Sequence, residues 1–350
     1  MQRKRFRNAD RSRPTLADVA SEAGVSTATV SRVLNRPGEV RDELRAKVEA
    51  TISRLGYLRD GVASALASNK SRTIGASVPT LDSEIFASGI NALERRLDED
   101  GYTLFVAVSG YDRPNEIRQV RALMERGAAG ILMIGSDHPP EVYDLLRQHQ
   151  RPFAYMWTYD ENSPHPCVGF DNVSAARQLT DYVLELGHRR VAMIAGQTLH
   201  NDRARHRVQG VRAALADRGL DLADSHFVEK SYGIWEGRHA ARFLLDRPRQ
   251  DRPTAIICGN DVLAFGCLFE CLHAGLRVPG DISIAGFDDL PLCEHLLPGL
   301  TTVHVPAKRM GSLAAEFMID SLAGGSPRSR VELPTQLVVR GSTGAPPADG

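Results

Sequence analysis

The 350-residue chain lacks the cysteine pattern of a disulfide framework or a structural zinc site. Its five cysteines form an odd set without a Cys-x-x-Cys pair: Cys167, Cys258, Cys267, Cys271 and Cys293. Cys267 and Cys271 are one helical turn apart in GCLFECLHAG, but their apolar neighbours favour buried packing thiols. We therefore expect neither a metal centre nor a covalent cross-link.

A secretion signal and a membrane segment are also missing. The basic stretch MQRKRFRNADRSR is not followed by the apolar run that either feature requires. With 42% hydrophobic and 25% charged residues, the chain can bury a large core and is long enough for more than one domain. We expect a globular cytoplasmic protein without a membrane partner.

Motifs for catalysis are scarce as well. The sequence contains no Gly-x-x-x-x-Gly-Lys run for a nucleotide and no convincing catalytic triad. Asp288 and Asp289 could bind a metal, but no His or second carboxylate pair stands nearby at ligand spacing. We predict that the chain is not an enzyme and uses no cofactor.

Charge is distributed unevenly, although 43 Lys and Arg balance 43 Asp and Glu. Residues 1–70 hold 14 basic against 8 acidic side chains, a net charge of +6 that leaves −6 for the remainder. A basic end is typical of a segment that meets a polyanion. Residues 1–14 form a basic flexible tail in this interpretation, and both phosphate contact and a purely solubilising role stay open.

The stretch TLADVASEAGVSTATVSRVLN predicts two short helices separated by a tight turn. Apolar residues from Leu16 to Ala23 repeat at helical spacing, Gly24 permits a left-handed cap, and Ser26 offers an N-cap oxygen. A third helix, DELRAKVEATISRLGYL, follows with the core positions Leu44, Val48, Ile52 and Leu55. This order predicts a helix-turn-helix, with a generic helical hairpin as the alternative.

The second helix carries no His, Cys or carboxylate, so it is suited to contact rather than to chemistry. Its inward positions are Val30, Val33 and Leu34. Its outward positions are Thr27, Ala28, Ser31 and Arg32. Such a face fits the major groove of DNA, where Arg32 can reach a guanine and Ala28 a thymine methyl, while hydroxyl groups meet phosphates.

From Thr73 onward, short apolar strands alternate with amphipathic helices. Strands are expected at TIGASVP, YTLFVAV, GILMIG, RPFAYMW, RRVAMIAG, TAIICGN and ISIAGF. This alternation predicts two doubly wound parallel-sheet subdomains, with a ligand cleft at the carboxyl ends of their strands. Polar residues at strand ends, such as Asp261 and Asp289, can equally be helix caps or turn formers.

These stretches together resemble the lac repressor and galactose repressor family of bacterial transcription regulators. The resemblance spans Thr15 to about Ser342 and is carried by TLADVASEAGVSTATVSRVLN, VGFDN, ELGHRRVAMIAG, AIICGNDVLAFG, VPGDISIAGFDDL and LPGLTTVHVP. VGFDNVSAARQLT is also similar to the gluconate-responding branch. The resemblance implies a small all-α helix-turn-helix head and an α/β sensor core like periplasmic sugar-binding proteins. We expect a homodimeric repressor of operator DNA that responds to a sugar or sugar acid.

The resemblance also implies a division of the chain. The DNA-binding head spans residues 15–58, a hinge helix or linker spans 59–72, and an effector-binding and dimerisation domain spans 73–345. Within that domain, the first subdomain is expected at about 73–188 and 303–324, and the second at about 189–302 and 325–345.

By the same resemblance, ten residues are expected to contact DNA: Thr15, Ser26, Thr27, Ala28, Thr29, Ser31, Arg32, Asn35, Ala63 and Leu66. The specificity positions are Thr27, Ala28 and Arg32. Leu66 would wedge open a minor-groove base step, unless it is an ordinary apolar linker residue. The hinge departs from the family at Arg59-Asp60, where Pro-Asn is common, and at Ser64, where many members have Arg. The resemblance therefore supports DNA binding by the hinge less strongly than DNA binding by the head.

The resemblance and the strand-end positions place the effector cleft at Phe86, Trp157, Thr158, Asp171, Arg203, Arg207, Tyr232, Trp235, Asn260 and Asp288. The two tryptophans could supply an apolar face for a sugar ring. Arg203 and Arg207 are one helical turn apart, and together they favour an acidic effector, because a guanidinium pairs well with a carboxylate or phosphate. In the alternative, only Arg207 enters the cleft, and Arg203 and Arg205 are solvated or paired with Asp202.

Two other classes of protein also fit a doubly wound fold. One is a sugar-converting or sugar-phosphorylating enzyme, which the missing catalytic motifs oppose. The other is a cytosolic sugar-binding receptor, which the basic head opposes.

Overall fold

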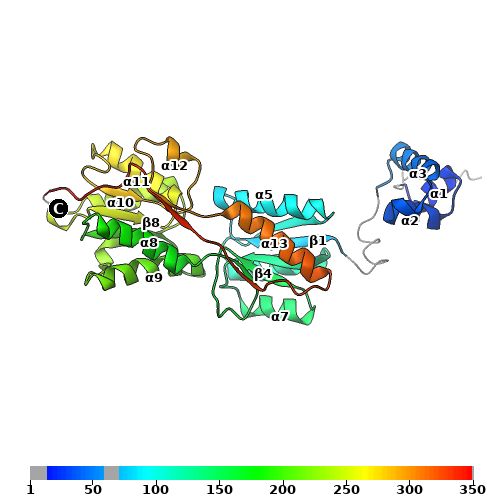
Figure 1. Cartoon of the computed structure of the whole chain (residues 1–350), viewed down its shortest axis with the longest axis horizontal. Helices are drawn as coiled ribbons and strands as arrows, with labels where there is room; N and C mark the ends of the chain where they lie inside the picture. The colour runs from blue at the N-terminus through cyan, green and yellow to red at the C-terminus, as the bar shows by residue number, and fades with distance from the viewer. Residues whose placement is uncertain (1–13, 59–70, 349–350) are drawn as a thin grey trace, which may run out of the picture. The chain divides into compact units, whose positions relative to one another are not determined.

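The computed structural model describes residues 14–58 and 71–348 of the chain. The chain divides into two compact units, residues 1–71 and 72–350 (Figure 1). The expectations for the basic tail before Pro14, for most of the hinge, and for Ala63 and Leu66 lie outside the described residues.

The head consists of three helices that begin and end where the cap residues predict. They are α1 (Leu16–Ala23), α2 (Thr27–Asn35) and α3 (Asp42–Leu55), with a 3-10 turn η1 (Pro37–Glu39) between the last two. Thr15 and Asp18 form a capping box on α1, and Gly24 ends it in the left-handed region at φ 66°. The Ser26 hydroxyl accepts a hydrogen bond from the backbone N–H of Thr29 at 3.1 Å and so caps α2.

All three helices contribute to one small core. Its buried members are Val19, Ala20, Ala23, Val30, Val33 and Val48. Ile52 and Leu55 of α3 pack against this cluster as expected, whereas Leu44 is partly exposed and is not part of it. The helix-turn-helix predicted from the sequence is therefore confirmed as a unit with a core of its own.

The first subdomain is built on a six-stranded parallel sheet with the strand order β11-β5-β4-β3-β1-β2. The strands are β1 (Thr73–Val78), β2 (Thr103–Val108), β3 (Ala128–Ile134), β4 (Phe153–Met156), β5 (Cys167–Gly169) and β11 (Arg330–Glu332). The helices are α5 (Glu84–Glu99), α6 (Arg113–Glu125), α7 (Pro140–Gln148) and α13 (Ala307–Leu322).

Helices cover both faces of this sheet because successive strand residues point to opposite sides. Along β3, Leu132 and Ile134 belong to the core under α5 and α13, whereas Ile131 and Met133 belong to the core under α6 and α7. Figure 1 shows α13 lying beside α5.

The second subdomain repeats this plan on a parallel sheet with the order β7-β6-β8-β9. Its strands are β6 (Val191–Gly196), β7 (Phe227–Lys230), β8 (Ala255–Cys258) and β9 (Ser283–Ala285). Its helices are α8 (Asn172–Glu185), α9 (Asp202–Asp217), α10 (Ile234–Leu245), α11 (Asp261–His273) and the short α12 (Leu292–His295), with 3-10 turns η2 (Asp224–His226) and η3 (Arg249–Asp251). The pair α8 and α9 covers one face of the sheet, and α10 and α11 cover the other (Figure 1).

The chain crosses between the subdomains three times, next to a short antiparallel pair of β10 (Thr302–His304) and β12 (Gln336–Val338). Two of the expected boundaries are wrong. Strand β11 pairs with β5 in the first sheet rather than joining the second subdomain, and α8 packs on α9 in the second subdomain rather than in the first. After β12 the chain returns to the second subdomain, where the Ser342 hydroxyl donates to the Ile284 carbonyl at 2.6 Å.

Candidate functional site

The exposed face of α2 has the composition that groove binding requires. Thr27, Ala28 and Arg32 are exposed, whereas Val30 and Val33 on the opposite side of the helix are buried. The first turn of α2 therefore presents a hydroxyl and a methyl group to solvent, and the next turn adds the guanidinium of Arg32 on the same face. This is the arrangement in which the first turn of a recognition helix reaches base edges.

Three of the expected DNA contacts also have a structural role in the head. Thr15 caps α1, and the hydroxyls of Ser26 and Thr29 lie 2.9 Å apart at the start of α2. Ser31 is partly buried. Asn35 is the last residue of α2, and its side chain is not among the described parts of the structure. The cap interactions orient the start of α2 and leave Thr27, Ala28 and Arg32 as its outward positions.

A cavity of about 220 Å³ lies between the two subdomains of the core, at the carboxyl ends of their strands. Its first-subdomain lining is Thr80, Asp82, Ser83, Ile85, Phe86, Tyr111 and Trp157. Its second-subdomain lining is Arg203, Arg207, Ser231, Tyr232, Asn260, Val262 and Asp288. The position agrees with the general rule that open α/β sheets bind ligands outside their strand ends.

Seven of the ten expected cleft residues line this cavity: Phe86, Trp157, Arg203, Arg207, Tyr232, Asn260 and Asp288. The other three lie elsewhere. Asp171 caps α8 by accepting hydrogen bonds from the backbone N–H groups of Val173 and Ser174, and Thr158 is buried beside Gly169. Trp235 is 62% exposed near the start of α10, where its ring lies against Arg238 and His239.

Half of the lining is not among the ten expected cleft residues, although signals for it exist in the sequence. The strand-end rule already places the stretch with Thr80 and Asp82 at the crevice, because it follows β1. Tyr111 follows β2 in the same way, and Ser231 directly precedes Tyr232 after β7. Applying the strand-end rule to every strand would also have found these last two residues.

Arg207 is held in place by groups of the protein itself. Its Nε donates to Asn172 Oδ1 at 3.0 Å, and its Nη1 donates to the Gly259 carbonyl at 2.6 Å. The guanidinium lies 3.7 Å from the ring centroid of Phe287, and its Nη2 is 3.7 Å from Asp288 Oδ1. The Nη2 group is the part of Arg207 left for a ligand.

Asp288 lies at the floor of the cavity with its backbone in the left-handed region at φ 120°. Burial raises the pKa of its carboxyl to about 8, Arg207 pulls it down, and the carboxyl of Asp261 adds to the rise. The raised pKa favours the protonated form of Asp288, in which the carboxyl can act as a hydrogen-bond donor. Because Asp288 is then neutral, the charge of Arg207 is not fully compensated.

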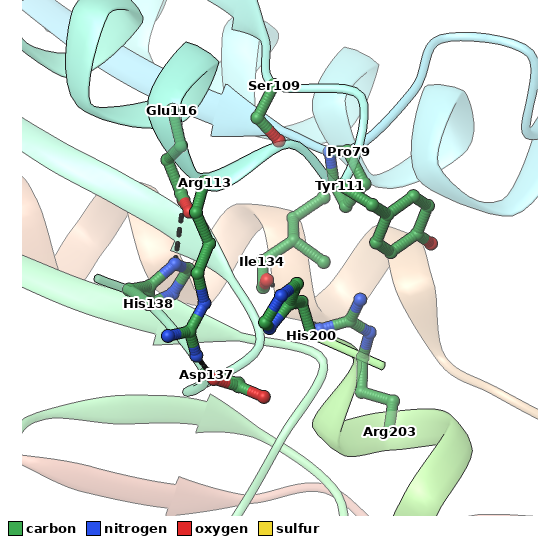
Figure 2. A pocket seen from close by; sticks show the side chains of 10 residues that line it. All are labelled: Pro79, Ser109, Tyr111, Arg113, Glu116, Ile134, Asp137, His138, His200 and Arg203. Atoms are coloured by element: carbon green, nitrogen blue, oxygen red, sulfur yellow. Dashed lines mark hydrogen bonds and ion pairs between the residues drawn. The ribbon is translucent and has the colours of Figure 1, made fainter. Parts of the chain in front are cut away.

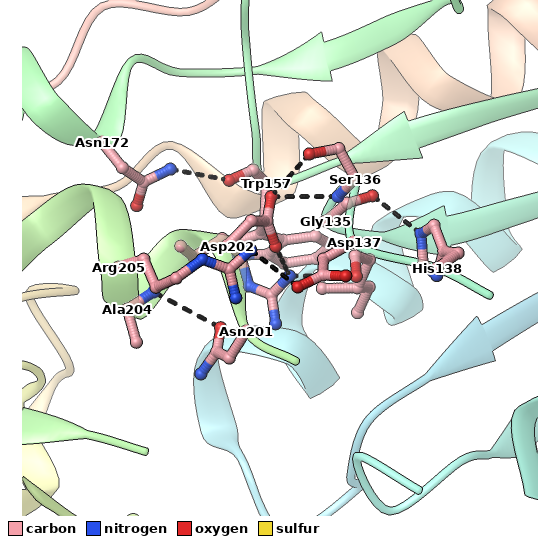
Figure 3. A network of polar contacts seen from close by, with 12 residues as sticks. Gly135, Ser136, Asp137, His138, Trp157, Asn172, Asn201, Asp202, Ala204 and Arg205 are labelled. Carbon is pink, nitrogen blue, oxygen red and sulfur yellow. Dashed lines mark hydrogen bonds and ion pairs between the residues drawn. The ribbon is translucent and has the colours of Figure 1, made fainter. Parts of the chain in front are cut away.

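Arg203 lines the cavity and is also paired with Asp202. The structure therefore contains elements of both alternatives predicted from the sequence, in which Arg203 either enters the cleft or pairs with Asp202. Its Nη1 donates to Asp202 Oδ1 at 2.8 Å and to the Ile134 carbonyl at 3.0 Å. Burial disfavours the charged form of Asp202, but Arg203 and the donors of Ser136 outweigh this effect, so the pKa of Asp202 lies below its usual value. Figure 3 shows the polar network around Asp202.

The remaining wall of the cavity is aromatic. The rings of Phe86 and Trp157 meet edge to face with centroids 5.1 Å apart. The buried indole Nε1 of Trp157 has no hydrogen-bond partner among the described residues. Burial raises the pKa of Tyr232 to about 12, so its phenol stays neutral, and Asn201 donates to its oxygen at 3.4 Å.

A smaller cavity of about 20 Å³ adjoins the first and shares Tyr111 and Arg203 with it. Figure 2 shows Arg113, Glu116 and His138 around it. Its volume is that of roughly one water molecule, so it is too small for an organic ligand.

Other kinds of site receive no support from the part of the chain that the structure describes. Within it, no group of three His, Cys, Asp or Glu residues is placed to hold a metal ion, and no helix is long and apolar enough to cross a membrane. All five cysteines are buried free thiols.

Comparison with known proteins agrees with both units. Residues 15–60 match the model of bacterial regulatory proteins of the lacI family, and residues 180–343 match the periplasmic binding protein-like domain. The chain is 32% identical to the HTH-type transcriptional regulator GntR of Escherichia coli K12 over 90% of this chain and 93% of that protein. It is also 32% identical to the ribose operon repressor of the same strain, over 94% and 99% of the two chains. The lac repressor dimer bound to operator and the anti-inducer ONPF superposes with a TM-score of 0.83 at 26% identity, covering 95% of this chain and 100% of that chain.

The head, the doubly wound core and its cavity define a DNA-binding transcription regulator with an effector-binding sensor domain. The chain belongs to the lacI family of bacterial regulatory proteins. It is a transcriptional regulator rather than an enzyme, which excludes the enzyme and receptor alternatives.

Proposed function

We propose that the protein is a cytoplasmic homodimeric repressor whose two heads occupy the half-sites of a palindromic operator. The observation that carries this proposal is the exposed face of α2, with Thr27, Ala28 and Arg32 outward over a core that the head forms by itself. A two-fold symmetric dimer matches a palindrome, because each head then meets the same sequence. The lac repressor neighbour, a dimer on its operator, supports this arrangement.

We propose further that the cavity between the subdomains binds a sugar acid in preference to the neutral sugar. Phe86 and Trp157 offer the apolar wall typical of carbohydrate sites. Arg203 and Arg207 bring two buried guanidinium groups to the same cavity, and the raised pKa of Asp288 favours its neutral form, which does not oppose an anion. A carboxylate on the ligand would therefore find donors and an uncompensated positive charge.

Effector binding in this cavity would change operator affinity, because the ligand contacts both subdomains and favours their closed arrangement. Linkage requires that operator DNA change the effector affinity by the same factor. The direction of the response, induction or co-repression, is decided by which arrangement binds DNA more tightly.

The first test is recovery of genomic fragments by the purified full chain at physiological salt, in parallel with Arg32→Ala. We expect one enriched palindrome with the unchanged protein and its loss with the variant. Capture of DNA without any enriched sequence would contradict sequence-specific recognition by α2.

The ligand class is tested by fluorescence. The chain has two tryptophans, so Trp235→Phe leaves Trp157 in the cavity wall as the only reporter. We expect aldonic acids to change its emission at lower concentrations than the matching aldoses. Equal or tighter binding of the neutral sugars would refute the proposed preference for an acid.

A further inference from the structure

The end of β3 and the loop after it in the first subdomain contact the start of α9 in the second through four polar contacts. Asp202 Oδ2 accepts hydrogen bonds from the Ser136 backbone N–H at 2.9 Å and from the Ser136 hydroxyl at 3.0 Å. Asp137 Oδ2 lies 2.6 Å from Arg205 Nη2, and Arg203 donates to the Ile134 carbonyl. Figure 3 shows Ser136, Asp137, Asp202 and Arg205 in this polar network.

The loop is fixed to the first subdomain independently of α9. His138 lies 2.7 Å from Glu116 Oε1 through Nδ1 and 2.9 Å from the Gly135 carbonyl through Nε2, and both His138 and Glu116 are buried. The Tyr143 hydroxyl donates to the Ser136 carbonyl at 2.9 Å. Arg113, in the same subdomain, pairs with Asp137 at 2.5 Å (Figure 2). The donors and the carboxylate of this loop are therefore already positioned when α9 approaches.

The opposite side of the contact is equally fixed. Asp202 is the first residue of α9 and is only 3% exposed. Its two carboxylate oxygens have different partners, since Oδ1 accepts from Arg203 on its own helix and Oδ2 accepts from Ser136 across the cleft. The side chain that orients Arg203 is thus the same one that contacts the other subdomain.

We propose that Ser136–Asp202 and Asp137–Arg205 form a clamp that holds the two subdomains closed over the ligand cavity and fixes Arg203 in its wall. Asp202 is a positioning residue in this scheme, because it acts on the ligand through Arg203. The clamp rests on the proposed function only for the identity of the ligand, since the contacts themselves are within the protein.

The two parts of the clamp differ in strength. Asp202 is buried and Ser136 is partly buried, and a hydrogen bond to a carboxylate in such surroundings is stronger than one in open water. Asp137 and Arg205 have side chains that are 17% and 44% exposed, so water and salt screen their attraction. Ser136–Asp202 therefore stabilises closure most, and Asp137–Arg205 adds a salt-dependent share.

The clamp can be tested in ligand-free protein by fluorescence energy transfer between the subdomains. Gln148→Cys on α7 and Ala216→Cys on α9 place two labels at exposed positions, and the five native cysteines are buried and do not compete. The variants are Ser136→Ala and Asp137→Asn. The matched control is Arg277→Gln, which removes an exposed ion pair with Asp281 that lies wholly within the second subdomain.

We expect Ser136→Ala to shift the open-to-closed ratio about tenfold toward open, from the loss of one charge-assisted hydrogen bond. Asp137→Asn should shift it about twofold to fivefold at low salt and less at high salt. Arg277→Gln should leave the ratio nearly unchanged. An unchanged ratio in Ser136→Ala, or an equal shift in the control, would overturn the proposal.

The outcome is independent of the proposed ligand, because no ligand is added in this experiment. If the protein failed to respond to any sugar acid, the proposed effector would be wrong while the clamp could still be measured. Conversely, sugar-acid binding with normal affinity in Ser136→Ala would separate the ligand site from the clamp and contradict it.

Discussion

Replacing Arg207 by Ala should destabilise the sensor core. An effect of this variant on ligand binding can therefore be interpreted only after its stability has been measured. The side chain is 6% exposed, and it satisfies the Asn172 side-chain oxygen and the Gly259 carbonyl. Removing it leaves two acceptors unsatisfied, at about 1–3 kcal/mol each, and deletes the contact over Phe287, worth about 2 kcal/mol. Water entering from the cavity recovers part of this, so we expect a loss of about 3–5 kcal/mol.

The assay is urea unfolding of the full chain followed by far-ultraviolet circular dichroism, with Arg205→Ala as the matched control. The Arg205 side chain is 44% exposed on the same helix, so its removal should lower the free energy of unfolding by less than about 1 kcal/mol. Arg207→Lys keeps the charge and the apolar stem but loses the planar fork, and it should lie between the two.

A loss below about 1 kcal/mol in Arg207→Ala would refute this reasoning, because it would mean that the partners of Arg207 find water at no cost. In that case, the loss of ligand response in the same variant could be assigned to direct ligand contact. If the core is destabilised as expected, the response must be compared in Arg207→Lys at matched folded fractions.

Three further outcomes are expected. Arg32→Ala should cost about 1–3 kcal/mol at the operator in a fluorescence anisotropy titration, and equal losses on unrelated DNA would contradict base readout. Gly311→Ala should lower the free energy of unfolding by about 1–3 kcal/mol, because an added Cβ would lie 2.1 Å from the Gly89 carbonyl oxygen; an unchanged Tm would show that α5 and α13 can separate freely. Burial raises the pKa of Asp288 to about 8, and the unfolded carboxyl ionises near 4, so the folded state holds the extra proton between these values. The stability of the unchanged protein should therefore fall relative to Asp288→Asn by up to about 1.4 kcal/mol per pH unit as pH rises through this window, and a constant difference from pH 5 to 7 would exclude the raised pKa.

The fold was predictable from the sequence because its signals are local. Gly24 and Ser26 mark the turn of the head through their own backbone and side-chain preferences, and both act as caps in the structure. The apolar runs of the core are buried strands flanked by helices, and they were recognisable without knowledge of their partners. The assignment of strands to subdomains needs long-range pairing instead. The three residues of β11 carry no local sign that they pair with β5 rather than with the second sheet.

The cavity was predictable where a residue's position follows from a strand end, and unpredictable where it depends on side-chain direction. Asn260 lies at the cavity because it closely follows the end of β8 and caps α11. Arg207 lies further along α9, and its place at the cavity was expected from the resemblance to the family rather than from a strand end. Trp235 is only three residues after Tyr232, but it falls on the outer side of the first turn of α10. Asp171 is predicted as a ligand contact, but in the structure it caps α8. The sequence does not distinguish the two roles, because both place an aspartate shortly after a strand.

The close approach of three backbones beneath Trp157 bears on how an effector would be sensed. The indole ring packs so tightly on Gly89 of α5 that an added Cβ there would lie 2.4 Å from the ring, and the Trp157 backbone N–H points to Met310 Sδ on α13 at 3.1 Å. Close-packed contacts of this kind leave no free space in which one group could move without displacing its neighbours. A ligand that displaced the indole would therefore press on both α5 and α13, so the bulk of a bound molecule would act on two long helices.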